Sequence, residues 1–162
     1  MLENQEINSF QINHMELLPG VYVSKIDSIG TEILTTFDLR LTRPNFEPVM
    51  NTAEIHTIEH LGAFFLRNDE GWKDKTIYFG PMGCRTGFYM ILKGDYSSEQ
   101  IVPLVEKMFE FIANFEGEIP GAQAKSCGNY LDMNLGMAHY WAYRYLQILQ
   151  DMRVENLYYP IS

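Results

Sequence analysis

The stretch VYVSKIDSIGTEILTTFDLRL, residues 21–41, carries the pattern that decides the fold. In its second half the side chains alternate between an apolar face and a polar face. The apolar face holds Ile33, Phe37, Leu39 and Leu41, and the polar face holds Thr36, Asp38 and Arg40. A period of two is typical of a half-buried antiparallel strand. Residues 21–26 precede a break at residues 28–30, and we expect them to pair with this strand as a hairpin.

A second pair of strands is expected further along the chain. Residues 76–79 and 86–92 are rich in β-branched and aromatic side chains, which favour strands. The sequence GPMGC, residues 80–84, separates them and contains the residues that tight turns prefer. The pattern predicts two strands joined by a short connection that presents Cys84.

Three helices complete the predicted fold. Asn51 and Glu54 have the spacing of a capping box, which predicts a helix over about residues 53–66. Ser97 and Gln100 repeat that signal before apolar residues at helical spacing. These residues are Ile101, Leu104, Val105, Met108, Phe109, Ile112 and Phe115. Asn134 is expected to cap a last helix over roughly residues 135–152, with Trp141, Tyr145, Ile148 and Leu149 in the core.

These elements predict an α+β fold, with an antiparallel sheet and helices packed on one face. The chain of 162 residues is expected to form a single domain, residues 1–162, which is long enough to bury a core without disulfides or a structural metal. A metal bound to this chain is therefore expected to be functional.

Charge and composition limit the kinds of partner that the chain can bind. Twelve Lys and Arg residues stand against 21 Asp and Glu residues, so the formal net charge is −9, which disfavours nucleic acid and anionic membranes. Residues 1–6 lack a basic and an apolar region, and no later stretch has the apolar length of a membrane span. We therefore expect a cytoplasmic protein whose two cysteines, Cys84 and Cys127, remain thiols.

The sequence HTIEH, residues 56–60, is the strongest chemical signal. His56 and His60 lie four residues apart, so on a helix both imidazoles face one way and can bind a divalent metal. Glu59 can then stand beside the metal as a general base without binding it. The alternative is a surface helix with two solvated histidines and an unrelated Glu.

A catalytic metal of this type takes three protein ligands, so a third ligand must come from elsewhere in the chain. Either cysteine or a downstream Glu could serve. A thiolate ligand would favour zinc or ferrous iron over magnesium or calcium. The remaining cysteine could then act as a base, since a metal or Arg85 nearby favours its thiolate. A metal, a carboxylate and a thiolate around one cavity suit repeated proton abstraction beside a carbonyl.

With these residues the chain strongly resembles the LuxS family, the S-ribosylhomocysteine lyases. The resemblance rests on SFQINH (9–14), FDLR (37–40), HTIEHL (56–61), PMGCRTGFY (81–89) and CG (127–128). It covers nearly the whole chain in the family's order. HTIEH alone is also found in peptidases of the inverted zincin type, whereas its combination with the other blocks is highly specific.

The resemblance implies that His56, His60 and Cys127 bind the metal, which is Fe²⁺ in the native state and is often replaced by Zn²⁺ or Co²⁺. It implies that Cys84 and Glu59 are the two acid/base groups. The implied reaction moves a carbonyl along the sugar by two metal-assisted enolisations, and β-elimination then releases homocysteine. The second product is 4,5-dihydroxy-2,3-pentanedione, the precursor of the autoinducer-2 signal.

The resemblance also implies a homodimer with active sites at the interface. Ser9, His14 and Arg40 would then contact the substrate bound to the neighbouring chain, and Arg67 matches an Arg near the homocysteine end. Arg40 is expected to reach the neighbour because it lies on the polar face of its strand. Tyr78 departs from the family pattern, since many members carry Asp there.

Two other functions fit parts of the sequence. A small inverted-zincin-type metallopeptidase would use Glu59 to activate water and Glu116 or Glu118 as third ligand. A non-catalytic metal-binding domain would close its site with both cysteines. Cys84 separates the readings, because it is a ligand in the closed site and a base in the lyase.

Overall fold

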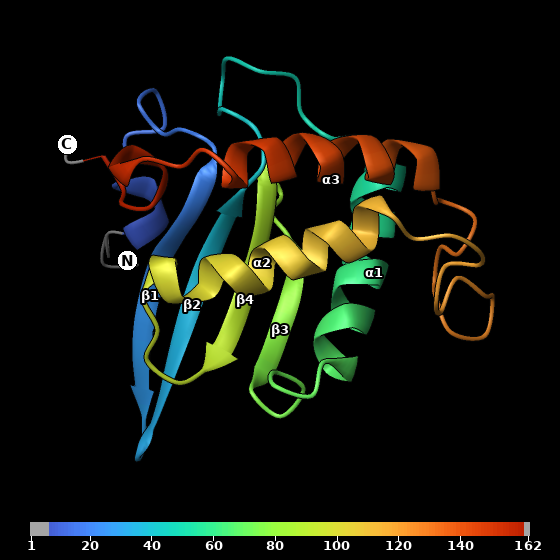
Figure 1. Ribbon diagram of the computed structural model, residues 1–162, viewed down its shortest axis with the longest axis horizontal. Coiled ribbons are helices and arrows are strands. Elements are labelled where there is room, and N and C mark those ends of the chain that lie inside the picture. The colour runs from blue at the N-terminus through green and yellow to red at the C-terminus, as the bar shows by residue number, and fades with distance from the viewer. Residues whose placement is uncertain (1–6, 161–162) are drawn as a thin grey trace, which may run out of the picture.

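The computed structural model describes residues 7–160 (Figure 1). Residues 1–6, on which part of the localisation prediction rests, lie outside the described residues. In chain order the elements are β1 (Gly20–Ile29), β2 (Glu32–Arg40), α1 (Thr52–Asn68), β3 (Thr76–Pro81), β4 (Gly87–Lys93), α2 (Ser98–Ala113) and α3 (Leu135–Leu149). Two short 3-10 helices, η1 (Asn8–Phe10) and η2 (Val154–Asn156), lie near the two ends.

The four strands form one antiparallel sheet in the order β1-β2-β4-β3. The predicted hairpin is confirmed, and Gly30, at φ +62°, supplies the left-handed backbone of its turn. Phe37 pairs with Met90 across the central strands. This register turns the apolar residues of both strands toward one face, as the alternation in the sequence predicts.

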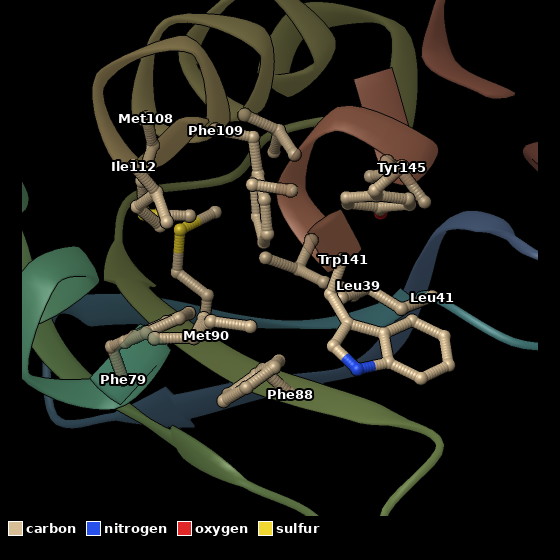
Figure 2. Close-up of a cluster of buried hydrophobic side chains, with 14 of the residues drawn as sticks. Leu39, Leu41, Phe79, Phe88, Met90, Met108, Phe109, Ile112, Trp141 and Tyr145 are labelled. Atoms are coloured by element: carbon tan, nitrogen blue, oxygen red, sulfur yellow. The ribbon is translucent and has the colours of Figure 1, made fainter. Parts of the chain in front are cut away.

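All three helices contribute to the core against that face, so the predicted α+β class is confirmed. In Figure 1, α2 crosses the strands, α3 runs along one end of the sheet and α1 lies beside β3. The core joins sheet and helices through fully or almost fully buried side chains (Figure 2). Among them are Leu39, Phe79, Phe88, Met90, Phe109, Ile112, Trp141 and Tyr145.

Helix α1 is fixed at its start by Glu54, which is only 2% exposed. The Glu54 carboxylate accepts hydrogen bonds from the Asn51 amide at 2.6 Å and from the Trp141 indole at 2.8 Å. The first bond caps α1, and the second ties α1 to α3. Further along, Gly62 packs directly against the Phe79 ring of β3. These contacts hold the helix that carries HTIEH in one position against the sheet.

Two details differ from the sequence predictions. Helix α3 ends at Leu149 rather than near residue 152, because Asp151 donates to the Ile148 carbonyl three residues back and tightens the last turn. The polar face of β2 is not solvated at its end, since Asp38 and Arg40 are 0% and 2% exposed. Over residues 7–160, the structure contains no helix with the length and hydropathy needed to cross a membrane.

Candidate active site

The HTIEH motif lies in the middle of α1, and its two histidines share one face of the helix as predicted. Their Nε2 atoms lie 3.1 Å apart, although the two rings are nearly perpendicular, with 79° between their planes. Both side chains are half-buried. Two imidazoles therefore direct one nitrogen each toward the same point.

The loop between α2 and α3 determines which ring nitrogen is available. His56 Nδ1 lies 3.0 Å from the Asp132 carbonyl oxygen, and His60 Nδ1 lies 2.8 Å from the Pro120 carbonyl oxygen. A carbonyl only accepts, so each Nδ1 carries the proton and each Nε2 keeps a free lone pair. Backbone carbonyls of this kind fix the tautomer and orientation of metal-binding histidines.

The same loop brings Cys127 to the two histidines. Its sulfur lies 3.4 Å from His56 Nε2, and the three possible ligand atoms all lie within 4.8 Å of one another. The Asn129 amide donates to this sulfur at 3.5 Å. Ligands of a tetrahedral zinc-type ion are separated by about 3.3–3.6 Å, as follows from bond lengths of about 2.0–2.3 Å. The separations of His56 Nε2 from His60 Nε2, 3.1 Å, and from the Cys127 sulfur, 3.4 Å, are close to this range, and the donor set suits a metal with two nitrogen ligands and one sulfur ligand.

Thr57 anchors the loop to α1 next to these ligands. Its hydroxyl donates to the Ala53 carbonyl at 2.8 Å and accepts from the Asn134 amide at 2.9 Å. Figure 1 shows the loop beside α1, between the end of α2 and the start of α3. The Thr57 hydroxyl thus links the backbone of α1, which carries His56 and His60, to the backbone at the end of the loop that carries Cys127.

A cavity of about 310 Å³ opens beside the histidines. Its walls come from α1 and from the turn between β3 and β4. Among its lining residues are His56, Glu59, Met82, Gly83 and Arg85. Glu59 is half-buried and belongs to the wall that carries His56, as a base beside a metal would. The cavity has room for a small polar molecule rather than a folded chain.

The turn between β3 and β4, which lines part of the cavity, carries Cys84. Arg85 has φ +62°, and its amide donates to the Met82 carbonyl at 3.0 Å, which closes the turn. The Met82 amide in turn donates to the Gly87 carbonyl at 3.0 Å. Cys84 is exposed and immediately follows Gly83, which lines the cavity. The predicted connection bearing Cys84 is confirmed.

Arg40 of the same chain lies next to Cys84. Its Nη1 is 2.7 Å from Thr86 Oγ1 and 3.9 Å from the Cys84 sulfur. Because Thr86 Oγ1 accepts from Arg40, its own proton is free to donate to the Cys84 sulfur 3.1 Å away. Burial lowers the pKa of Arg40, but the Asp38 carboxylate outweighs this effect and raises it overall, so the guanidinium stays charged.

The predicted contact of Arg40 with substrate in a neighbouring chain stays a prediction, but the free polar strand face on which it was based is not found, because Arg40 is buried. Its guanidinium is paired with Asp38 through Nε at 3.0 Å and Nη2 at 2.5 Å, inside its own chain. Alternation along β2 correctly placed Arg40 opposite the core, but the C-terminal end of the chain covers this part of that face. A role of Arg40 toward substrate remains a prediction.

The remaining predicted site residues lie apart from the metal ligands. Ser9 belongs to η1, and His14 Nδ1 is 2.8 Å from the Ile12 carbonyl, both before β1. Strand β1 is at the sheet edge opposite β3 and α1. Arg67 lies in the last turn of α1, about 10 Å along the helix from His60. Tyr78 is exposed on β3 with its ring folded over Gly80.

Four groups at the site were not predicted to act there: two had no signal in the sequence, and two had a signal that was not used. The Pro120 and Asp132 carbonyls act through the backbone, which leaves no signal in residue type. Thr86 had a signal, since it lies two residues after Cys84 and shares its turn. Asp38 also had one, because it precedes Arg40 by two residues on the same strand face.

Three proteins similar to this chain carry the same name, S-ribosylhomocysteine lyase. A Clostridium beijerinckii S-ribosylhomocysteine lyase is 64% identical over 157 residues, covering 96% of this chain and 99% of the relative. The corresponding Finegoldia magna protein is 62% identical and covers 96% of this chain and 98% of the relative. The Borreliella burgdorferi protein (strain ZS7) is 54% identical, with 96% and 99% coverage.

The family described as S-Ribosylhomocysteinase (LuxS) matches residues 7–155, which include all three candidate metal ligands, Glu59 and Cys84. The match therefore spans every element that builds the cavity and its two walls. The resemblance inferred from the motifs is confirmed, and the chain belongs to the LuxS family of S-ribosylhomocysteinases.

Proposed function

We propose that this chain is an S-ribosylhomocysteine lyase in which Glu59 and Cys84 transfer protons on opposite sides of the cavity. The observation that supports the proposal is a three-ligand cluster next to a cavity that Glu59 lines, together with Gly83, the chain neighbour of the exposed Cys84. Relatives that align with nearly the whole chain are named for this activity.

The chemistry of the substrate explains why two acid/base groups are needed. In S-ribosylhomocysteine the sulfur is attached to C5 of ribose, while the opened sugar has its carbonyl at C1. A C–S bond breaks readily by β-elimination only when the carbonyl is at C3, because C4 is then acidic. The carbonyl must therefore move by two positions, and each move takes a proton from one carbon and returns a proton to its neighbour.

Glu59 and Cys84 can share these transfers from either side of the sugar. First a proton moves from C2 to C1, and then another moves from C3 to C2. Removal of the C4 proton finally expels homocysteine thiolate from C5, and the remaining enol ketonises to 4,5-dihydroxy-2,3-pentanedione. Arg40 and Thr86 place a positive charge and a hydroxyl group beside the Cys84 sulfur.

His56, His60 and Cys127 would hold the metal, and we propose Fe²⁺, with Zn²⁺ or Co²⁺ able to replace it. Two imidazoles and a thiolate suit these ions better than Mg²⁺ or Ca²⁺. The metal, when bound, supplies a Lewis acid that polarises a carbonyl and acidifies the neighbouring C–H bonds. Free thiols and ferrous iron persist in a reducing compartment, which supports a cytoplasmic location.

We also propose a homodimer with shared sites, now without Arg40 as a residue from the partner. Ser9 and His14 precede the edge strand β1, whereas the metal ligands lie beyond the other edge of the sheet. This placement favours a second chain as the source of these two residues, as the resemblance to the family implies. The sheet face opposite the helices also carries half-buried Leu34, Thr36 and Ile91 and exposed Tyr78, which a partner could cover.

The two alternative functions make different use of Cys84. Nothing in residues 7–160 places Glu116, Glu118 or Cys84 within the ligand cluster, so a zincin-like third ligand and a closed four-ligand site both lack support. The test is to incubate purified protein with S-ribosylhomocysteine without oxygen. A thiol reagent should detect homocysteine, and a 1,2-diamine should trap an equal amount of the dicarbonyl. Absence of both products from metal-loaded protein would rule out the lyase.

A further inference from the structure

A buried polar network connects the C-terminal segment, residues 154–160, to the catalytic turn. Tyr159 donates a hydrogen bond to Asp38 Oδ2 at 2.8 Å. Asp38 binds the Nε and Nη2 edge of Arg40, and the Nη1 of Arg40 faces Thr86 and Cys84. One continuous set of contacts thus runs from the penultimate described residue to the thiol.

The shape of the guanidinium makes this network directional. Its three nitrogens lie in one rigid plane, so binding one edge to a carboxylate determines where the third nitrogen points. Asp38 is fully buried, and Oδ2 accepts from both Arg40 and Tyr159. A buried carboxylate with fewer donors would be free to rotate, and the guanidinium would turn with it.

Two further contacts hold Tyr159 in place. Its ring stacks on Tyr22, with 4.8 Å between ring centres and 11° between ring planes. The Tyr22 hydroxyl lies 2.8 Å from the Glu155 carbonyl, which ties the start of the C-terminal segment to β1. The segment is therefore built onto the sheet rather than merely ending there.

We propose that Tyr159 and Asp38 are positioning residues, through which the C-terminal segment directs the Arg40 guanidinium toward Cys84. The proposal rests on the assignment of Cys84 as an acid/base group. Two effects of the Tyr159 hydroxyl act in the same direction. It restrains the Asp38 carboxylate, and it draws negative charge from Asp38, so that less of the Arg40 charge is cancelled near the sulfur.

Tyr159→Phe tests this with little disturbance, since the ring and its stacking on Tyr22 are retained. The matched control is Tyr158→Phe, which removes the neighbouring hydroxyl and its 2.6 Å bond to Glu99. The readout is the rate of Cys84 alkylation by iodoacetamide against pH, measured on metal-loaded protein and resolved by peptide mass spectrometry. Urea unfolding of each variant verifies that the fold is retained.

We expect Tyr159→Phe to move the half-maximal alkylation rate of Cys84 to higher pH by about half a unit, because the thiolate loses nearby positive charge. Turnover at neutral pH should fall about threefold with an unchanged KM, since proton transfer rather than binding is affected. Tyr158→Phe should match the parent protein in both measurements.

The proposal is overturned if the Tyr159→Phe profile coincides with that of the parent, or if Tyr158→Phe shifts the profile equally. Alkylation does not depend on turnover. A shifted profile in a protein that releases no homocysteine would therefore support the positioning network while contradicting the lyase assignment.

Discussion

At the residue scale, the ring nitrogens of His56 and His60 have different roles. Nδ1 of each ring donates to a loop carbonyl, which leaves the two Nε2 atoms facing each other at 3.1 Å, with the Cys127 sulfur 3.4 Å from that of His56. We predict that the purified protein binds about one metal ion per chain, and that His56→Ala, His60→Ala or Cys127→Ala reduces the occupancy to below about 0.1. Metal analysis after anaerobic purification measures this directly.

Cys84→Ala is the control for metal binding, since Cys84 lies outside the ligand cluster. It should retain the full metal content of the parent. If Cys84→Ala lost as much metal as Cys127→Ala, the site would be a closed structural one, and Cys84 could not be a free acid/base group.

Much of the site was accessible from residue types and spacing, and the rest was not. Helical spacing alone is enough to identify His56, Glu59 and His60 as site candidates. Cys127 needed the family resemblance, because no spacing in the sequence relates a loop residue to a helix 67 positions earlier. The surroundings of Arg40 were misread, since alternation gives the face of a strand but not what covers it.

At the element scale, the position of α1 depends on close contact between Gly62 and β3. A Cβ atom added to Gly62 would lie 2.3 Å from the Phe79 ring, and that ring is stacked on Phe88 at 5.2 Å. We predict that Gly62→Ala lowers the free energy of unfolding by roughly 1–3 kcal/mol, despite the better helix propensity of Ala. Urea denaturation followed by circular dichroism measures the change.

The matched control is Gly136→Ala, in the first turn of α3. Gly136 is exposed, and an added Cβ would meet only Asn134 Oδ1, at 3.8 Å. This change should raise the free energy of unfolding by roughly 0.5–1 kcal/mol, because only the helix propensity term remains. Stabilisation by both substitutions would show that α1 is not packed tightly against β3.

Element boundaries followed local signals where those signals were strong. The capping patterns at Glu54, Gln100 and Asn134 each mark the start of a helix in the structure. The end of α3 was missed by three residues, because Met152 continues the apolar helical spacing of Ile148 and Leu149 while the backbone already tightens. A helix end that lacks a glycine or proline is hard to predict from the sequence.

At the scale of the whole molecule, two buried tyrosines, Tyr22 and Tyr145, and the half-buried Tyr159 make stability sensitive to alkaline pH. Burial, followed by the charge of Asp38, raises the pKa of Tyr22, Tyr145 and Tyr159 above the ordinary value of 10.0. The unfolded chain therefore loses these protons first. We predict constant stability from this source below about pH 10 and a loss above it of up to about 1.4 kcal/mol per tyrosine per pH unit.

Denaturant unfolding between pH 8 and pH 11 tests this, with tyrosinate absorbance as a second probe. Tyr143→Phe is the control, since Tyr143 is 65% exposed and should leave the pH dependence unchanged. Tyr145→Phe should reduce the slope. A free energy of unfolding that stays level up to pH 11 would contradict the burial of these phenols.

The proposed dimer makes a second prediction at this scale. If His14 serves the partner's site, a heterodimer of His14→Ala with Cys84→Ala contains one site with both lesions and one with neither. Mixing the two inactive homodimers under exchange conditions should restore up to about half of the activity per exchanged dimer. Mixing Arg40→Ala with Cys84→Ala should restore nothing, because both residues belong to the same site.

Other outcomes would distinguish between the possible arrangements of the active sites in the dimer. Recovery in the Arg40 mixture would mean that Arg40 acts across the interface after all. No recovery in the His14 mixture, with heterodimers confirmed by mass spectrometry, would confine each site to one chain.

The central claim is that Glu59 and Cys84 both transfer protons beside a metal that neither of them binds. The most direct measurement is homocysteine release from S-ribosylhomocysteine by metal-loaded parent protein, Glu59→Gln and Cys84→Ala, each with its metal content determined on the same sample. We predict full metal in all three proteins, turnover by the parent, and a loss of about 10²-fold or more in each variant, with a ketose intermediate accumulating. Turnover at the parental rate by either metal-loaded variant would contradict the two-base account.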